Sequence, residues 1–357
     1  MVNKKELYSD IYNRAQNIYE QYQDLIMKKS KKNTPNYSLE FSINNYSSLG
    51  GKAWSKNNLD NIEINRGVID NFFDYFYEFA KIQTDDLLEK LHIEDVEDSS
   101  YEFLKFDKNG NPNLFDSKTL EYKLAGLLTI FVSRFIITHE LGHLLNGHCE
   151  YLNSKEQGEE QYIPMFEEVG SKNERKVPPL DYRTLEMDAD AFAATESCKY
   201  LFQMYEEFET QVDKGLNIEP IDLFYWWSFS IRSNFLITQR ILNDEEYSLD
   251  KEHLPSVARW VLVLDSTTRI IEEELYSINY KFGDNKEKIL KYIAKGFLFA
   301  EKQYNERFYT NYNSVEEIEN NNTDFINYVT ATQKKWDNFR NELGKFSRLP
   351  LYKSNNI

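Results

Sequence analysis

A long apolar stretch that ends in a pair of histidines limits most strongly how this chain can fold. Asp116 or Ser117 can cap the start of a helix, and Gly147 can end it after Asn146. The turns before the histidines are apolar, with Leu124, Leu127, Leu128, Phe131 and Phe135. A helix with this much apolar surface must be buried, so residues 117–146 are predicted to form a core helix.

The histidines belong to the motif His139-Glu140-Leu141-Gly142-His143. Positions i and i+4 share one face of a helix, so both imidazoles can point at one metal ion. Glu140 is rotated by about 100° from His139, at about 3.6 residues per turn, and flanks the ion as a base for water. The alternative is two histidines at the exposed edge of a core helix. Burial disfavours it, because buried histidines and a glutamate without partners are costly.

A catalytic zinc site needs a third protein ligand and an open fourth position. His148 and Cys149 follow the motif closely, but His148 lies just past the helix end, where it is expected on the surface or lining a cleft. The favoured candidate is Glu186, in the pattern E-x-x-A-D-x-x-A at 186–193. Asp190 is one turn further on and can accept the Nδ1–H of a zinc-bound histidine. The alternative is an ordinary amphipathic helix whose acids face water.

With a histidine pair completed by a glutamate on a later helix, the sequence resembles the gluzincin zinc peptidases, which implies a zincin-like fold and one zinc ion per chain. Lys52-Ala53-Trp54 is similar to the edge strand that pairs with substrate in the HtpX-type branch, so Ala53 and Trp54 are expected to bind substrate. His253-Leu254-Pro255-Ser256-Val257-Ala258-Arg259 is similar to that branch's H-P-P-x-x-x-R element. The resemblance implies that Arg259 braces the Glu186 helix or the zinc cleft and that His253 steadies the oxyanion. A helix start near Pro255 is the alternative reading of His253.

Composition and charge narrow the class of protein. The net charge of −17 argues against a nucleic-acid partner. Two cysteines, Cys149 and Cys198, and a charged N-terminus are typical of a cytoplasmic protein without a signal peptide. The longest apolar stretches, 124–137 and 223–237, are too short to span a membrane. A soluble chain with these motifs resembles phage-exclusion peptidases of the Lit type or regulator-cleaving peptidases of the ImmA/IrrE type.

Hydrophobic periodicity predicts an α+β fold that is mostly helical, in a single domain over residues 1–357. A small N-terminal β-sheet is expected within 36–66, the zinc-binding helices within 117–213, and a helical C-terminal part over 220–345. A polar, acidic stretch at 149–180 separates the two zinc-binding helices and could act as a lid or be a surface loop.

The predicted function is a zinc-dependent endopeptidase acting on a protein or peptide. Glu140 would take the proton of the attacking water and return it to the leaving amine. One alternative is a zinc-binding scaffold or sensor without hydrolysis, for which His148 or Cys149 would close the site as a fourth ligand. Another is a defence or toxin-like effector protease that stays silent until an unknown activating partner opens its cleft.

Overall fold

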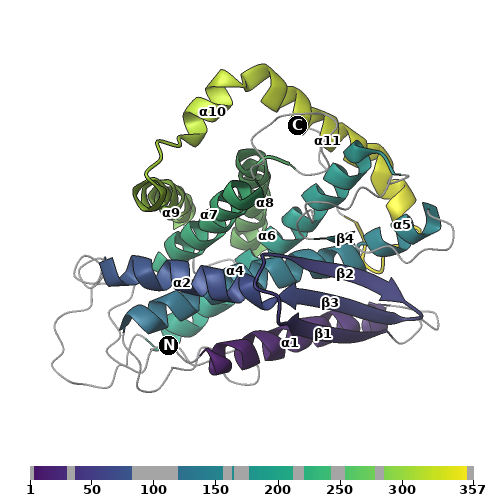
Figure 1. Cartoon of the computed structure of the whole chain (residues 1–357). Coiled ribbons are helices and arrows are strands. Elements are labelled where there is room, and N and C mark those ends of the chain that lie inside the picture. Colours follow the sequence, from purple (N-terminus) through teal and green to yellow (C-terminus); the bar gives the residue numbers. More distant parts are fainter. Residues whose placement is uncertain are drawn as a thin grey trace.

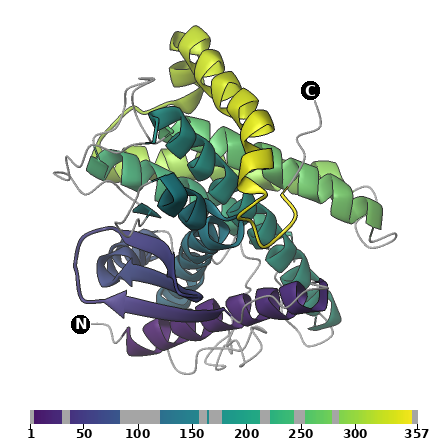
Figure 2. The same cartoon turned by 90° about the vertical axis from the view of Figure 1, so that its right-hand side faces the viewer.

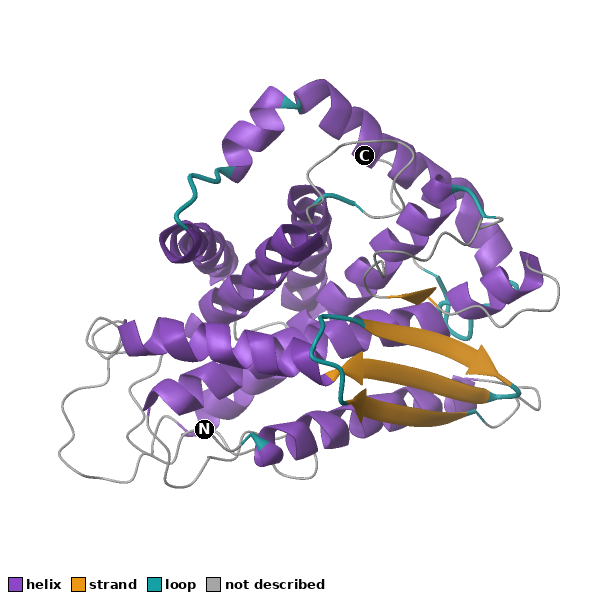
Figure 3. Cartoon of the chain, viewed as in Figure 1, coloured by secondary structure: helices purple, strands orange, loops and turns teal. Residues whose placement is uncertain are grey.

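The computed structural model describes residues 4–29, 37–82, 120–155, 163–164, 177–211, 221–242, 254–277 and 285–351. Helices dominate this part of the chain, and its strands form one small sheet (Figure 3). The helices are α1 (Lys5–Lys29), α2 (Arg66–Ile82), α4 (Leu120–Leu145), α5 (His148–Lys155), α6 (Pro179–Gln211), α7 (Asp222–Leu242), α8 (Ser256–Ser277), α9 (Asn285–Phe308), α10 (Ser314–Asn320) and α11 (Asn322–Leu343). The predicted α+β, mostly helical class is confirmed.

The sheet has the strand order β1-β3-β2-β4, with β1 (Ser38–Asn44), β2 (Gly51–Lys56), β3 (Leu59–Asn65) and β4 (Ile163–Pro164). Strands β2 and β3 form an antiparallel hairpin, whereas β1 pairs with β3 in parallel. The hairpin turns at Asn57 and Asn58, whose φ angles are 52° and 65°. Asparagine tolerates this left-handed conformation, which a two-residue hairpin turn requires at both positions. The sheet therefore lies within the predicted range, apart from β4.

Helix α4 is the centre of the core and packs against α1, α2, α6 and α7, with β2 alongside it (Figure 1). Its length and composition would suit a membrane span, but 89% of the apolar window lies inside the protein. Its apolar residues are covered by the neighbouring elements, as expected for a core helix. The predicted burial of this helix is confirmed.

The remaining helices enclose this centre. Helix α1 runs along the sheet next to β1 (Figures 1 and 2), where it also contacts α4. Helices α7, α8 and α9 pack together, and a buried ion pair of 2.8 Å joins Arg232 on α7 to Glu301 on α9. Helix α11 packs against α6 and lies along the upper right of the molecule in Figure 1.

The segment after α11 returns to the end of α4. The backbone N–H of Arg348 donates to the carbonyl of Leu145 at 2.9 Å. The Arg348 guanidinium donates to Asp60 at 2.8 Å and to Glu150 at 2.5 Å. One residue thus ties together the last turn of α4, strand β3 and helix α5. Two short helices, α5 and α10, had no predicted counterpart. Helix α5 falls at the start of the stretch that was expected to be polar.

Candidate metal centre

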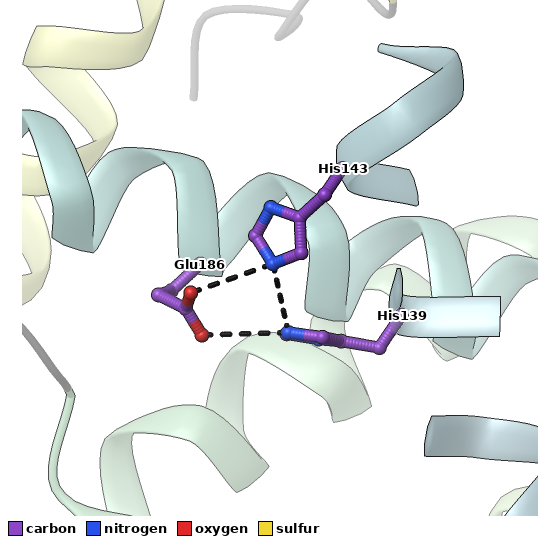
Figure 4. Close-up of side chains that lie close together, drawn as sticks. All are labelled: His139, His143 and Glu186. Carbon is purple, nitrogen blue, oxygen red and sulfur yellow. Dashed lines mark hydrogen bonds and ion pairs between the residues drawn. The ribbon is translucent and has the colours of Figure 1, made fainter. Parts of the chain in front are cut away.

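Two helices bring the predicted metal ligands together. His139 and His143 lie one turn apart on α4, and their Nε2 atoms are 3.1 Å apart (Figure 4). Glu186 projects from α6, with its Oε2 3.4 Å from His139 Nε2 and its Oε1 3.4 Å from His143 Nε2. The three side chains are buried, being at most 2% exposed. They form a group that could hold a metal ion.

The spacing of these ligand atoms fits zinc. Zinc–nitrogen and zinc–oxygen bonds of about 2.0–2.2 Å at tetrahedral angles place neighbouring ligand atoms about 3.3 Å apart. The observed separations are 3.1 and 3.4 Å. Two imidazoles and one carboxylate are also a common ligand set of catalytic zinc. The residues present therefore fit a single zinc ion, with three protein ligands among the described residues.

Small residues at the helix crossing set this spacing. A Cβ atom added to Gly142 would lie 3.2 Å from the Cα of Ala189 and 3.3 Å from the Cβ of Phe192. Gly142 lies between the two histidines, and Ala189 lies one turn after Glu186. The absence of a side chain at 142 therefore lets α4 and α6 approach closely enough for ligands from both helices to meet.

His139 is held from behind by a carboxylate. Its Nδ1 is 2.9 Å from Oδ1 of Asp190, which is fully buried one turn after Glu186 on α6. Arg259 on α8 donates to both oxygens of Asp190, from Nε and Nη2, at 2.7 Å each. Asp190 thus contacts His139, and Arg259 contacts Asp190 on the Glu186 helix, whereas the supporting roles expected for both residues stay predictions.

The carboxylate of Glu140 is the unusual group of the site. It is fully buried, and neither of its oxygens has a hydrogen-bond partner among the residues that the structure describes. Burial and the nearby Glu186 outweigh the attraction of His139 and raise the pKa of Glu140 to about 8. A buried carboxyl without a partner is costly. Glu140 is therefore suited to bind a group that the protein itself does not supply, such as a water molecule at the ion.

The charge state of the metal-free ligands differs from one histidine to the other. Burial lowers the pKa of His139, but hydrogen bonds to Asp190 and Glu186 outweigh it and raise that pKa to about 10. Burial lowers the pKa of His143 to about 3. The two histidines hold the pKa of Glu186 well below its usual value despite its burial. Without metal, a protonated His139 thus neutralises part of the charge of Glu186 and Asp190.

A second set of contacts surrounds His143 and was not predicted. Its Nδ1 lies 2.9 Å from Nδ1 of His148, and Nε2 of His148 lies 3.0 Å from Oδ2 of Asp188. Asn146 donates to the same Asp188 oxygen at 2.6 Å. The expectation that His148 lies on the surface or lines a cleft is wrong, since His148 is fully buried at the start of α5. The sequence feature that could have indicated this position is a third histidine directly after the glycine that ends the helix.

The other candidate residues lie around this centre. Cys149 is buried with its Sγ 3.7 Å from the carbonyl of Ala53, and burial raises the pKa of its thiol. Neither His148 nor Cys149 belongs to the ligand group. Ala53 is fully buried in β2, and the half-buried Trp54 lies under Nζ of Lys52 at 5.2 Å. His253 lies outside the described residues.

The edge of β2 is not entirely open. Strand β4 pairs with it antiparallel, with Lys52 opposite Pro164 and Ala53 opposite Ile163. A peptide that bound to this edge beside Ala53 would therefore have to replace β4 at these two positions. Substrate binding by Ala53 and Trp54 stays a prediction.

A scan against protein-family models found no match to this chain, and searches of curated proteins and of solved structures found none either. The resemblance to gluzincin peptidases therefore rests on the motif residues alone.

Proposed function

We propose that this protein is a zinc-dependent endopeptidase. The observation that carries the proposal is the three-residue ligand group together with Glu140 beside it. This buried carboxylate has no hydrogen-bond partner in the described part of the chain. A structural zinc site is normally closed by four protein ligands, whereas a hydrolytic site keeps one position for water. The ligand group has three members among the described residues, which favours hydrolysis over the scaffold alternative.

His139, His143 and Glu186 would hold the ion. Bound zinc supplies a Lewis acid that lowers the pKa of water toward about 7 and polarises the substrate carbonyl. Glu140 accepts the proton of the attacking water and then donates it to the nitrogen of the leaving amine. Asp190 holds the imidazole of His139 in position, and Arg259 in turn holds Asp190. The proposed setting remains the cytoplasm.

The test compares wild type with Glu140→Gln, which keeps the size of the side chain and removes its basicity. Both proteins should contain about one zinc per chain by mass spectrometry, because Glu140 is not a ligand. Wild type should cut peptides of a proteome-derived library, and Glu140→Gln should cut about 10²–10⁴-fold more slowly. Glu121→Gln, at the half-buried start of the same helix, is the matched control and should cut normally. Equal digestion by wild type and Glu140→Gln would contradict the proposal.

One observation favours a peptidase that is activated by a partner. Strand β4 pairs with β2 at Lys52 and Ala53, where an extended substrate would pair in the proposed binding mode. Replacing Ile163 and Pro164 by glycines should weaken this pairing and raise the rate of cleavage without changing zinc content. An unchanged rate would contradict the idea that β4 restrains the enzyme.

A further inference from the structure

The set of buried polar groups behind His143 has no place in the proposed reaction. It runs from His143 through His148 to Asp188, with Asn146 at its end. The rings of His143 and His148 are 5.1 Å apart and inclined at 68°, so they meet edge to face with their Nδ1 atoms 2.9 Å apart. All four side chains are buried, at 8% exposure or less. Because the groups are buried, a proton on the wrong nitrogen would leave a polar atom without a partner, which is costly.

The proton positions follow from the role of His143 as a ligand. A histidine that binds an ion through Nε2 carries its proton on Nδ1. That proton can be donated only if Nδ1 of His148 is a bare acceptor. The neutral ring of His148 then carries its proton on Nε2, where the Asp188 carboxylate accepts it. The contacts are thus mutually satisfied by one arrangement, in which both rings are neutral and Asp188 is ionised.

We propose that His148 and Asp188 are positioning residues that fix the ring and the tautomer of His143. The inference rests on the metal centre of the proposed function. His139 is held directly by a carboxylate, whereas His143 is held by a carboxylate that acts through a second imidazole. The two ligand histidines therefore have different supports. The support of His143 depends on two residues instead of one.

The backbone conformation of Gly147 places His148 next to His143. Gly147 has a φ of +80°, a left-handed conformation that glycine adopts without strain. It ends α4 and lets α5 begin at once with His148. A Cβ atom at Gly147 would lie 2.5 Å from the carbonyl carbon of Phe346, so the segment after α11 closes over this turn. His148 is thereby turned back toward His143, instead of continuing the helix.

The test measures the zinc dissociation constant by competition with a chelator. His148→Phe removes the acceptor for the Nδ1 proton and should weaken zinc binding by about 10–100-fold. His148→Gln should recover part of this loss, because its amide oxygen can accept the same proton. Asp188→Asn should also weaken binding, since it removes the charge that fixes the proton on His148. Cys149→Ala is the matched control, as the next residue of α5 and equally buried, and should bind zinc as wild type does.

Proton positions give a second measurement that a purely structural role would not affect. Long-range ¹H–¹⁵N NMR spectra of the zinc-loaded protein with labelled histidine should show His143 protonated on Nδ1 and His148 on Nε2. His148 protonated on Nδ1 would overturn the proposal, as would unchanged zinc affinity in both His148 variants. Thermal melting of the metal-free variants separates loss of affinity from loss of folding. A wild-type chain that binds no zinc would instead contradict the proposed function. It would also remove the basis for the positioning role of His148 and Asp188.

Discussion

Arg259 donates two hydrogen bonds to Asp190, the carboxylate that contacts the candidate metal ligand His139. Both hydrogen bonds are 2.7 Å long, and the same Asp190 oxygen that accepts from Nη2 of Arg259 contacts His139. The pair joins α8 to α6, so the position of His139 depends on a helix that contributes no ligand. This arrangement satisfies a buried carboxylate that would otherwise be costly.

Replacing Arg259 should therefore affect both folding and metal binding. Arg259→Met leaves Asp190 buried without its cation, which should cost about 3–5 kcal/mol of unfolding free energy in urea denaturation. Zinc should bind about 10–100-fold more weakly. Arg259→Lys should keep only part of the stability and of the zinc affinity, because an ammonium group cannot donate in the same forked geometry. Arg269→Met, which breaks a more exposed pair with Asp265 on the same helix, should cost about 1 kcal/mol or less.

Removing Glu186 should abolish most of the metal binding. Glu186→Ala leaves two histidine ligands, whereas Glu140→Gln leaves all three, so mass spectrometry should find zinc depleted only in the first variant. Glu196→Ala changes another glutamate of α6, one that pairs with Lys199 away from the ligand group, and should keep its zinc. Full zinc occupancy in Glu186→Ala would show that the third ligand is a different residue.

Stability of the metal-free protein should depend on pH through Glu140. The folded-state pKa of Glu140 is raised from 4.5 to about 8, chiefly by burial. A raised pKa means that the folded state holds the proton more tightly than the unfolded state. The stabilisation that the proton on Glu140 gives to the folded state is complete below about pH 4.5. It is lost as the pH rises through about 8. Zinc-free wild type should accordingly lose stability relative to Glu140→Gln between these pH values.

His139 should extend this loss in the metal-free protein. Its pKa is raised from 6.5 to about 10, so its contribution is complete below about pH 6.5 and disappears as the pH rises through about 10. The pKa of His143 is lowered instead, so the folded state binds this proton less tightly than the unfolded state. The resulting stabilisation is complete above about pH 6.5 and no longer changes at higher pH. Urea midpoints of chelator-treated protein should therefore fall from pH 6.5 to 9.5. A midpoint that rises over this range would contradict the assigned shifts.

A larger residue at position 142 should push the two ligand helices apart. Gly142→Leu would place side-chain atoms against Ala189 and Phe192, where a Cβ atom alone already comes within 3.2–3.3 Å. Overpacking of this kind should cost about 1–3 kcal/mol and should weaken zinc binding, because Glu186 moves with α6. Gly142→Ala should have a much smaller effect on both. Unchanged zinc affinity in the leucine variant would mean that the helix crossing does not set the spacing of the ligands.

Local spacing was sufficient to predict the part of the site that lies on single helices. One helical turn separates His139 from His143 and Glu186 from Asp190, so the shared face of each pair follows from helix geometry. The apolar residues before His139 likewise predicted the buried helix. That α4 and α6 meet at Gly142 could be learned only from the tertiary structure.

The error at His148 has a clear physical cause. A glycine that ends a helix usually leads into a surface loop, and the sequence after Gly147 is polar and acidic. The positive φ of Gly147 instead starts a new buried helix at once, and the segment near Phe346 covers the turn. This contact joins residues about two hundred positions apart, so no local pattern could reveal it. Pairing of β4 with β2 is another such contact.

The cap on α4 determines when the metal centre can be completed. The carbonyl of Leu145 receives its hydrogen bond from Arg348, whose guanidinium also contacts Asp60, 288 positions earlier in the chain. A growing polypeptide therefore displays both ligand histidines long before it carries the residue that closes their helix. Closing a loop of this length is a late and entropically costly step of folding. We expect metal uptake in the final geometry to require Arg348, so the proposed hydrolysis would begin only after this residue has been synthesised.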